Sequence, residues 1–423
     1  MSGNWPLNGS DYLMLGFDHE LRREGFAGNS CQIVLELAGR ISREELAGRL
    51  RELTEEIPLL RTRPGGIFRP HWRGLNGKLT APKVTMHADE PEIEQNLFNQ
   101  ALDTRRGELM RFDVLERKRG GSSLIFTWSH ALMDGPGGEH FLALVGNRDV
   151  AVPNRLFSEP VGKGPSFRER TKLAWRYLHH IDTYCKQPAK TMGVRHSAAS
   201  AELRYSVERF SLEETNRARA NGVKLCGPLG DGQFHAAAAM MELHRLHERL
   251  GSKSASYILP IPVGMRPKGK IEPLFGNQMA MLMLQILPEH LASMEALVGA
   301  IKEQTSHLLR SGLMDCGVKL SEMFRFLPLP VYMALLKQGL KGEICSIFCG
   351  DTAGVTPLLS RFMGTEVEDF AHVAPVTPTP GVGIVFYSFR GELRVSVIYS
   401  MKVLNPTEAA GFAAGVRARL LEQ

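Results

Sequence analysis

The residues best suited to chemistry lie in one short stretch, SHALMDG, at positions 129–135. His130 can act as a general base, because an imidazole exchanges a proton near neutral pH and keeps a ring nitrogen open to the substrate. Asp134, four residues on, can close the loop or hold a cation, and Gly135 lets the backbone turn beside the histidine without a Cβ atom. The same spacing also fits a hydrogen-bonded core histidine before a turn, so the surrounding sequence must separate the two interpretations.

The residues around His130 predict a buried strand, a tight turn and then a helix. Positions 124–128 (LIFTW) are apolar, β-branched and aromatic, which is typical of a strand covered on both faces. The cluster DGPGG at 134–138 favours turn geometry, and the apolar spacing after it predicts a helix from about Gly138. A rigid strand end would therefore present His130 at a compact loop.

Length and composition are those of a globular protein with a large core. The chain has 423 residues, and because single cores stop growing near about 250 to 300 residues, two domains are expected. Hydrophobic residues make up 43% and charged residues 23%, which is ordinary for a soluble protein. We expect residues 1–186 to form one lobe, 187–200 a linker and 201–423 a second lobe, with helices and strands alternating in both.

Charge and cysteine usage limit the classes of partner. The net charge of +6 suits anionic partners, including phosphate-bearing cofactors, acidic carrier proteins or a membrane surface. The basic residues are dispersed and have no aromatic ladder between them, so nucleic-acid binding is not indicated. Six scattered cysteines and an N-terminus without a basic start or an apolar segment favour a cytoplasmic protein with free thiols. No window of eighteen successive apolar residues is present, so no integral membrane segment is expected.

Two groups of potential metal ligands have a plainer interpretation. His235, His244 and His247 fall on one predicted helix, but no cysteine or carboxylate stands at a convincing spacing, so a helix face is favoured over a metal site. Cys345 and Cys349 lack a second pair and are interpreted as ordinary buried thiols.

Two buried strands are expected in the second half of the chain, at 257–267 and 278–288. Met279, Met281 and Met283 would line one face of the second strand. We interpret them as core residues rather than as a cofactor site, although beside a substrate tunnel they would contact an acyl chain.

Several separated segments resemble the thioester-dependent acyltransferase superfamily. Its members include chloramphenicol acetyltransferase-like enzymes, wax ester synthase/diacylglycerol acyltransferases, polyketide-associated acyltransferases and peptide-synthetase condensation domains. WSHALMDG is similar to their HHxxxDG signature. Other segments of the chain occur in an order similar to that of the superfamily: SDYLML, PLLRTR, PIPVGMRP with GNQMAMLMLQILP, and VFYSFRGELRVSVIYS. Only the first of these motifs is specific.

The resemblance implies an α/β fold in which two chloramphenicol acetyltransferase-like lobes form a V-shaped pseudo-dimer with a tunnel between them. A small-molecule acyl donor, either acyl-CoA or a phosphopantetheine thioester on an acyl or peptidyl carrier protein, would enter one mouth. The alcohol or amine acceptor would enter the other. No tightly bound cofactor and no metal are implied.

Residue by residue, His130 matches the catalytic second histidine, which removes a proton from the acceptor as it attacks the thioester carbonyl. Asp134 matches the motif aspartate, which pairs with an arginine and fixes the loop. Arg61 and then Arg266 are the candidates for that partner. Gly135 would leave room in the tunnel.

Three more residues are expected at the tunnel: Trp128, Ser129 and Asn277. Asn277 is the candidate donor to the oxyanion of the tetrahedral intermediate, and a turn asparagine is its plainer interpretation. Ser129 stands where the first histidine of the motif belongs. The resemblance is therefore restricted to superfamily members that tolerate another residue at that position. The segment SIFCGDTAG at 346–354 matches the family's SNxPGP-like stretch poorly, and the DFGWG segment of the plant acyltransferases is missing.

Two functions of different classes follow. The first is an acyltransferase that moves an acyl group from a thioester to an alcohol or amine, with a free-standing condensation enzyme that forms an amide as its variant. The second is a non-catalytic domain of the same fold that docks a carrier protein. Retention of His130 with Asp134 and Gly135 favours the enzyme, whereas Ser129 favours the docking domain. The acyl chain and the acceptor depend on pocket shape, which distant segments build together.

Overall fold

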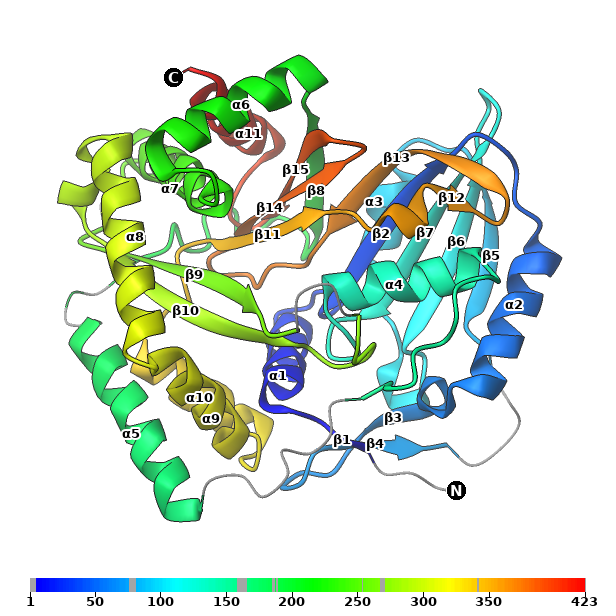
Figure 1. Cartoon of the computed structure of the whole chain (residues 1–423), viewed down its shortest axis with the longest axis horizontal. Helices are drawn as coiled ribbons and strands as arrows, with labels where there is room; N and C mark the ends of the chain where they lie inside the picture. The colour runs from blue at the N-terminus through cyan, green and yellow to red at the C-terminus, as the bar shows by residue number, and fades with distance from the viewer. Residues whose placement is uncertain are drawn as a thin grey trace.

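The computed structural model describes residues 5–75, 81–157, 166–184, 187, 189–252, 254–266, 271–340 and 342–422. The chain forms two α/β lobes that lie side by side, and α1 (Gly9–Arg23) lies near the middle, between them (Figure 1). This is the two-lobed arrangement that the sequence predicts.

The first lobe is built on a six-stranded sheet. Its order is β12 (Arg361–Phe362), β13 (Thr365–Val373), β2 (Ser30–Leu37), β7 (Ser122–Ser129), β6 (Met110–Glu116) and β5 (Lys83–Ala88). Neighbouring strands are antiparallel except for β5 and β6. Figure 1 shows α2 (Arg43–Glu56) and α4 (Gly135–Gly146) in front of this sheet, and α3 (Ile93–Phe98) lies behind it.

The second lobe contains a four-stranded sheet in the order β11 (Phe348–Gly354), β14 (Val382–Phe389), β15 (Glu392–Ser400) and β8 (Leu203–Arg209). Helices α6 (Leu212–Cys226), α7 (Asp231–Arg249) and α11 (Pro406–Leu421) pack against this sheet, and α8 (Met294–Arg310) packs on α7 (Figure 1). A separate antiparallel pair, β9 (Tyr257–Gly264) and β10 (Met279–Ile286), extends from these helices toward the first lobe (Figure 1).

The remaining elements are short or peripheral. A three-stranded sheet has the order β1 (Trp5–Pro6), β4 (His71–Gly74) and β3 (Thr62–Gly65). The other helices are α5 (Phe167–Tyr184), α9 (Leu313–Phe324) and α10 (Leu329–Gly339). Single turns of 3-10 helix are η1 (Pro58–Arg61), η2 (Thr104–Arg106), η3 (Pro288–Ala292) and η4 (Pro357–Leu359).

One segment of the chain crosses from the second lobe into the first and returns, and the expected domain boundaries do not include this crossover. After β11 the chain leaves the second lobe, adds β12 and β13 to the sheet of the first lobe, and returns as β14. The expected assignment of all of 201–423 to the second lobe is therefore wrong for residues 361–373. Apolar and polar residues alternate irregularly along β13, which has a register shift between Val367 and Asp369. Its sequence is therefore only a weak indication of a strand.

One helix boundary also differs from the sequence prediction. Helix α4 begins at Gly135 rather than near Gly138, because Asp134 caps it and a proline is tolerated in the first turn of a helix. Helices α9 and α10 are separate, and Pro328 is the residue that precedes α10.

Candidate active site

His130 lies at the end of a strand that is buried along its whole length. All eight residues of β7 are buried, and β7 is paired with β2 on one side and β6 on the other. The backbone N–H of His130 donates to the Asn29 carbonyl at 2.9 Å, and its own carbonyl accepts from Nδ2 of Asn277 at 2.8 Å. Both polar groups of the His130 backbone are thus held, and the side chain is half-buried at a rigid strand end.

The environment of the His130 ring favours its neutral form. Burial lowers the pKa of His130, and polar backbone groups and Asp134 oppose that effect. Its Nδ1 atom is buried and has no hydrogen-bond partner among the described residues. A neutral imidazole at neutral pH is the form that a general base requires.

The Asp134 carboxylate is fully engaged in structural contacts. One oxygen accepts from the backbone N–H of Gly137 at 3.0 Å and so caps α4. The other accepts from Nη1 of Arg266 at 2.5 Å and from the backbone N–H of Gln278 at 2.9 Å. The partner of Asp134 is therefore Arg266, the second of the two candidates. Arg61, the first candidate, ends η1 and is not the residue that pairs with this carboxylate.

Asn277 positions the histidine loop. Its Nδ2 atom donates to Oδ1 of Asp11 at 3.0 Å as well as to the His130 carbonyl, so both amide hydrogens are occupied. Its backbone N–H also donates to Asp11, at 2.7 Å. Both side-chain hydrogens are thus bonded within the protein, and a role of Asn277 toward the tetrahedral intermediate stays a prediction. Its plainer interpretation, a structural asparagine, describes these bonds.

Asp11 is a site residue that the sequence analysis did not identify. It lies in the first turn of α1, where it forms a capping box with Asn8, and it is almost fully buried. Burial raises the pKa of Asp11 to about 7. The motif Asn-x-x-Asp at positions 8–11 signals a helix start, but its contact with residue 277 is a long-range pairing that no local pattern indicates.

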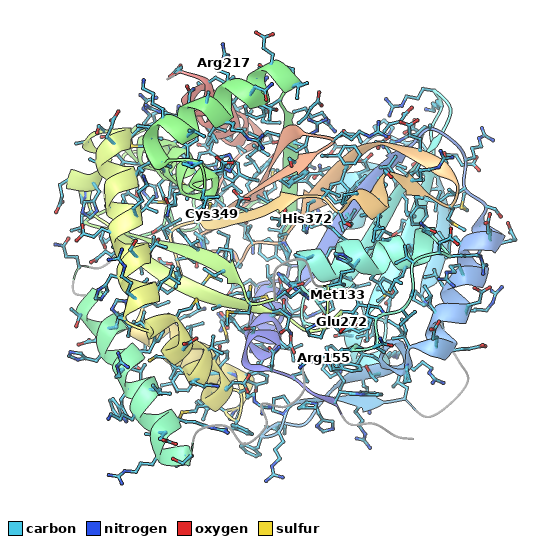
Figure 2. All side chains as sticks on the ribbon, viewed as in Figure 1. Met133, Arg155, Arg217, Glu272, Cys349 and His372 are labelled. Carbon is cyan, nitrogen blue, oxygen red and sulfur yellow. The ribbon has the colours of Figure 1, made fainter. Side chains whose placement is uncertain are left out.

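Gly135 leaves room for another side chain. A Cβ atom at Gly135 would lie 2.5 Å from Cε1 of His372, which β13 brings from the far end of the chain. The expectation that Gly135 leaves room in a tunnel stays a prediction. His372 is buried, its ring centroid is 6.2 Å from that of Trp128, and Figure 2 shows it near the centre of the molecule where the lobes meet.

The environment of His372 also disfavours a charged ring. Burial is the main cause that lowers the pKa of His372 to about 4, and the nearby His130 adds to the effect. No local sequence pattern indicates His372, because the residue reaches the site through the crossover that carries β13 into the first lobe.

Trp128 and Ser129 lie in the core under the histidine loop. Trp128 is completely buried, and its Nε1 donates to the Met133 carbonyl at 3.0 Å. Ser129 is also buried and is paired with Ser30 of β2. Neither residue lines any of the three cavities described below, and their expected place at a tunnel stays a prediction.

The first of three cavities adjoins residues that hold the histidine loop. It has a volume of about 290 Å³ and is lined by residues 276–279 and by the start of α1, including Asn277 and Asp11. A second, about 150 Å³, adjoins it between α1 and β10. A third, about 560 Å³, lies beside β9 in the second lobe, and its lining includes Tyr387, whose ring centroid is 6.4 Å from that of His372. His130 lines none of the three.

The histidines and cysteines considered as metal ligands have ordinary partners. Nδ1 of His235 contacts the Asp351 carboxylate at 2.8 Å, Nδ1 of His244 contacts the Tyr257 hydroxyl at 2.9 Å, and Nδ1 of His247 contacts the Ser252 hydroxyl at 3.2 Å. Cys345 and Cys349 are free thiols, and burial raises the pKa of both.

Neither a metal cluster nor a membrane helix is found in the part of the chain that the structure describes. Within those residues, no three side chains of histidine, cysteine, aspartate or glutamate are grouped so that they could hold a metal ion. The helices among them are all too short or too polar to cross a membrane.

Comparison with known proteins gives a fold and no close relative. No protein-family model and no curated protein sequence matches the chain. The first condensation domain of the calcium-dependent antibiotic synthetase, solved with a substrate analogue, is 16% identical with a TM-score of 0.72 over 100% of this chain and 96% of that one. The condensation domain of the monacolin K polyketide synthase MokA is 15% identical with a TM-score of 0.65, over 99% and 97%.

An acetyltransferase has a similar structure over an equal length. The trichothecene 15-O-acetyltransferase from Fusarium sporotrichioides is 12% identical with a TM-score of 0.70, over 99% of this chain and 95% of that one. The resemblance inferred from the sequence is thus confirmed at the level of the fold. The chain has the two-lobed fold that is shared by these condensation domains and this acetyltransferase.

Proposed function

We propose that the protein transfers an acyl group from a pantetheine thioester, as acyl-CoA or on a carrier protein, to an alcohol or amine, with His130 as the general base. The observation that carries this proposal is the state of His130. Its backbone is fixed by Asn29 and Asn277, burial favours its neutral ring, and a cavity lined by Asn277 adjoins its loop.

The proposed reaction needs one proton acceptor. The acceptor oxygen or nitrogen attacks the thioester carbonyl carbon while Nε2 of His130 takes its proton, because Nδ1 is buried. The tetrahedral intermediate then collapses, the C–S bond breaks, and the imidazolium returns the proton to the leaving thiolate. The products are an ester or amide and a free thiol. Holding donor and acceptor on either side of one histidine makes the attack effectively intramolecular.

Asp134 is assigned a structural role in this scheme. Its oxygens accept from Gly137, Gln278 and Arg266, so it orders the loop rather than exchanging a proton with substrate. The folds of the similar condensation domains and acetyltransferase support acyl transfer as the reaction class, and an ester-forming enzyme and a free-standing condensation enzyme are both forms of it.

The test uses purified protein with two donor types, acyl-CoA and acyl-pantetheine on a carrier protein, and a mixed panel of alcohols and amines. We expect free thiol to appear only when donor and acceptor are both present, and mass spectrometry to find the matching ester or amide. Thioesters that co-purify with the protein identify the donor directly. Absence of acceptor-dependent thiol release with both donor types would contradict the proposal.

A second function is favoured by two observations. Ser129 replaces the first histidine of the motif, and His130 lines none of the three cavities, as in a domain that docks a carrier protein without catalysis. That function predicts saturable binding of an acylated carrier protein in which the thioester remains intact. Thiol release that depends on acceptor and is lost in His130→Ala would exclude it.

A further inference from the structure

A small apolar cavity lies between the lobes and has no role in the reaction described above. Its volume is about 150 Å³, and it is bounded by α1, α5, α9, α10 and one face of β10. Its lining is almost entirely apolar and includes Leu13, Phe17, Met281, Met283, Phe324 and Leu336. We call it the methionine pocket. Figure 1 shows α1, β10 and the pair α9 and α10 grouped around this region.

The two faces of β10 have different surroundings. Leu282 and Leu284 are buried in the core of the second lobe, whereas Met281 and Met283 are half-buried on the opposite face, toward the methionine pocket. This placement leaves open the alternative stated for these methionines from the sequence, in which they contact an acyl chain. Protein interiors are close-packed, so an apolar space of this size beside flexible thioether side chains is suited to an adaptable ligand contact.

The methionine pocket adjoins the cavity beside the histidine loop. Ser10, Met279 and Val318 line both spaces, together with Ser321. The neighbouring cavity is in turn lined by Asn277, whose side chain binds the carbonyl of His130. A bound molecule can therefore have its polar part beside residues 276–279 and its apolar end in the methionine pocket.

We propose that the methionine pocket binds a compact apolar group of about six carbons, linear or phenyl, that belongs to a substrate of the acyl transfer. This inference rests on the proposed function for the identity of the substrate. The size follows from the volume, because an apolar cavity of about 150 Å³ stays dry and accommodates a benzene ring. The group is carried either by the acyl donor or by the acceptor, and the experiment distinguishes these two sources.

The kinetic test varies the chain length on each substrate separately. One arm uses acyl-CoA from two to ten carbons with a fixed acceptor, and the other uses n-alkyl alcohols and amines of the same lengths with a fixed donor. In the arm that fills the pocket, we expect kcat/KM to rise about fourfold for each methylene up to about six carbons and then to level or fall. A flat profile in both arms would overturn the inference.

A substitution that fills the methionine pocket tests the proposal specifically. Met281→Trp replaces the thioether side chain with a larger indole ring, which fills the cavity. The ratio of kcat/KM for the six-carbon substrate to that for the two-carbon substrate is therefore expected to fall at least tenfold. Met86→Trp, the same change at a half-buried methionine of β5 in the other lobe, is the matched control and should keep the wild-type ratio. An unchanged ratio in a folded Met281→Trp protein would contradict the proposal.

A binding measurement separates this inference from the proposed function. Protein labelled at the methionine methyl groups is titrated with n-hexanol and, for comparison, with ethanol. We expect saturable shifts of the Met281 and Met283 signals with n-hexanol only, no shift at Met86, and loss of the Met283 shift in Met281→Trp. Binding of n-hexanol without any turnover would support the pocket as a binding site and contradict acyl transfer as the function. Turnover without these shifts and without chain-length dependence would reject the pocket alone.

Discussion

Arg266 and Asp134 form an ion pair that joins the two lobes, with 2.5 Å between Nη1 and Oδ2. Asp134 follows the histidine strand of the first lobe, and Arg266 follows β9 of the second. Their side chains are 10% and 12% exposed, so the pair is largely shielded from solvent. The loop that carries His130 therefore takes its shape from both lobes, and its geometry depends on their docking.

The first prediction concerns the stability supplied by this pair. Asp134→Ala leaves the Arg266 charge largely buried and removes the cap of α4, so we expect the free energy of unfolding to fall by about 3 to 5 kcal/mol. Urea unfolding at pH 7 measures it. Arg148→Ala, which breaks an exposed pair with Glu52, is the control and should be neutral. An Asp134→Ala protein as stable as the wild type would contradict the structural role of this carboxylate.

The second prediction concerns the contact between Gly135 and His372. Gly135→Ala places a Cβ atom 2.5 Å from the His372 ring, so we expect a loss of about 1 to 3 kcal/mol in unfolding free energy and a lower kcat/KM. Adding His372→Ala removes the clash, so the double variant should be more stable than the two single effects predict together. Gly411→Ala, at an exposed helix position with open space around it, is the control. Strict additivity would show that the ring is free to move away.

The third prediction concerns Glu139, a buried residue of α4. Burial raises its pKa from 4.5 to about 7, against the hydrogen bond that it accepts from the backbone N–H of Thr356. Because the folded-state pKa is the higher one, the stabilising contribution of the protonated group is complete below pH 4.5 and is lost as the pH rises to about 7. The resulting loss of unfolding free energy amounts to roughly 3 kcal/mol.

Glu139→Gln removes this titration while keeping an oxygen for Thr356. We expect the unfolding free energy of Glu139→Gln to exceed that of the wild type at pH 8 and to vary less between pH 5 and pH 8. Urea unfolding of both proteins across that range measures the difference. Parallel pH profiles for the two proteins would show that Glu139 does not titrate in this window.

The fourth prediction concerns the pH dependence of the rate. Burial lowers the pKa of His130, so the base stays neutral at pH values where an ordinary histidine is already half-protonated. We expect kcat/KM to be constant near neutral pH and to fall on acidification with a midpoint below 6.5. A midpoint above 6.5 would mean that the ring is stabilised in its charged form, contrary to its surroundings.

The local parts of this site could be predicted from the sequence, because they depend on neighbouring residues. The apolar run at 124–128 and the cluster DGPGG predict β7, the turn and α4, and they place His130 at the strand end. The choice of Arg266 over Arg61 could not be made in that way. It depends on how β9 of one lobe approaches the loop of the other, which is a long-range packing relationship.

The same limit explains the residues that were missed. His372 reaches the site only because β13 crosses into the first lobe, and Asp11 only because α1 packs against residue 277. Asn277 was assigned to the oxyanion because its type suits a donor, but the hydrogens of its side chain are already bonded to Asp11 and His130. Residue type indicates what a side chain can do, and the fold decides which of its atoms remain free.

Acceptor-dependent thiol release tests most directly whether His130 takes the proton of the attacking acceptor. The rate is compared among wild type, His130→Ala and His130→Gln, with urea unfolding to confirm that each variant is folded. We predict that both substitutions reduce kcat/KM by about 10²- to 10⁴-fold, as expected for loss of a general base. Folded His130 variants that release thiol at the wild-type rate would contradict the account.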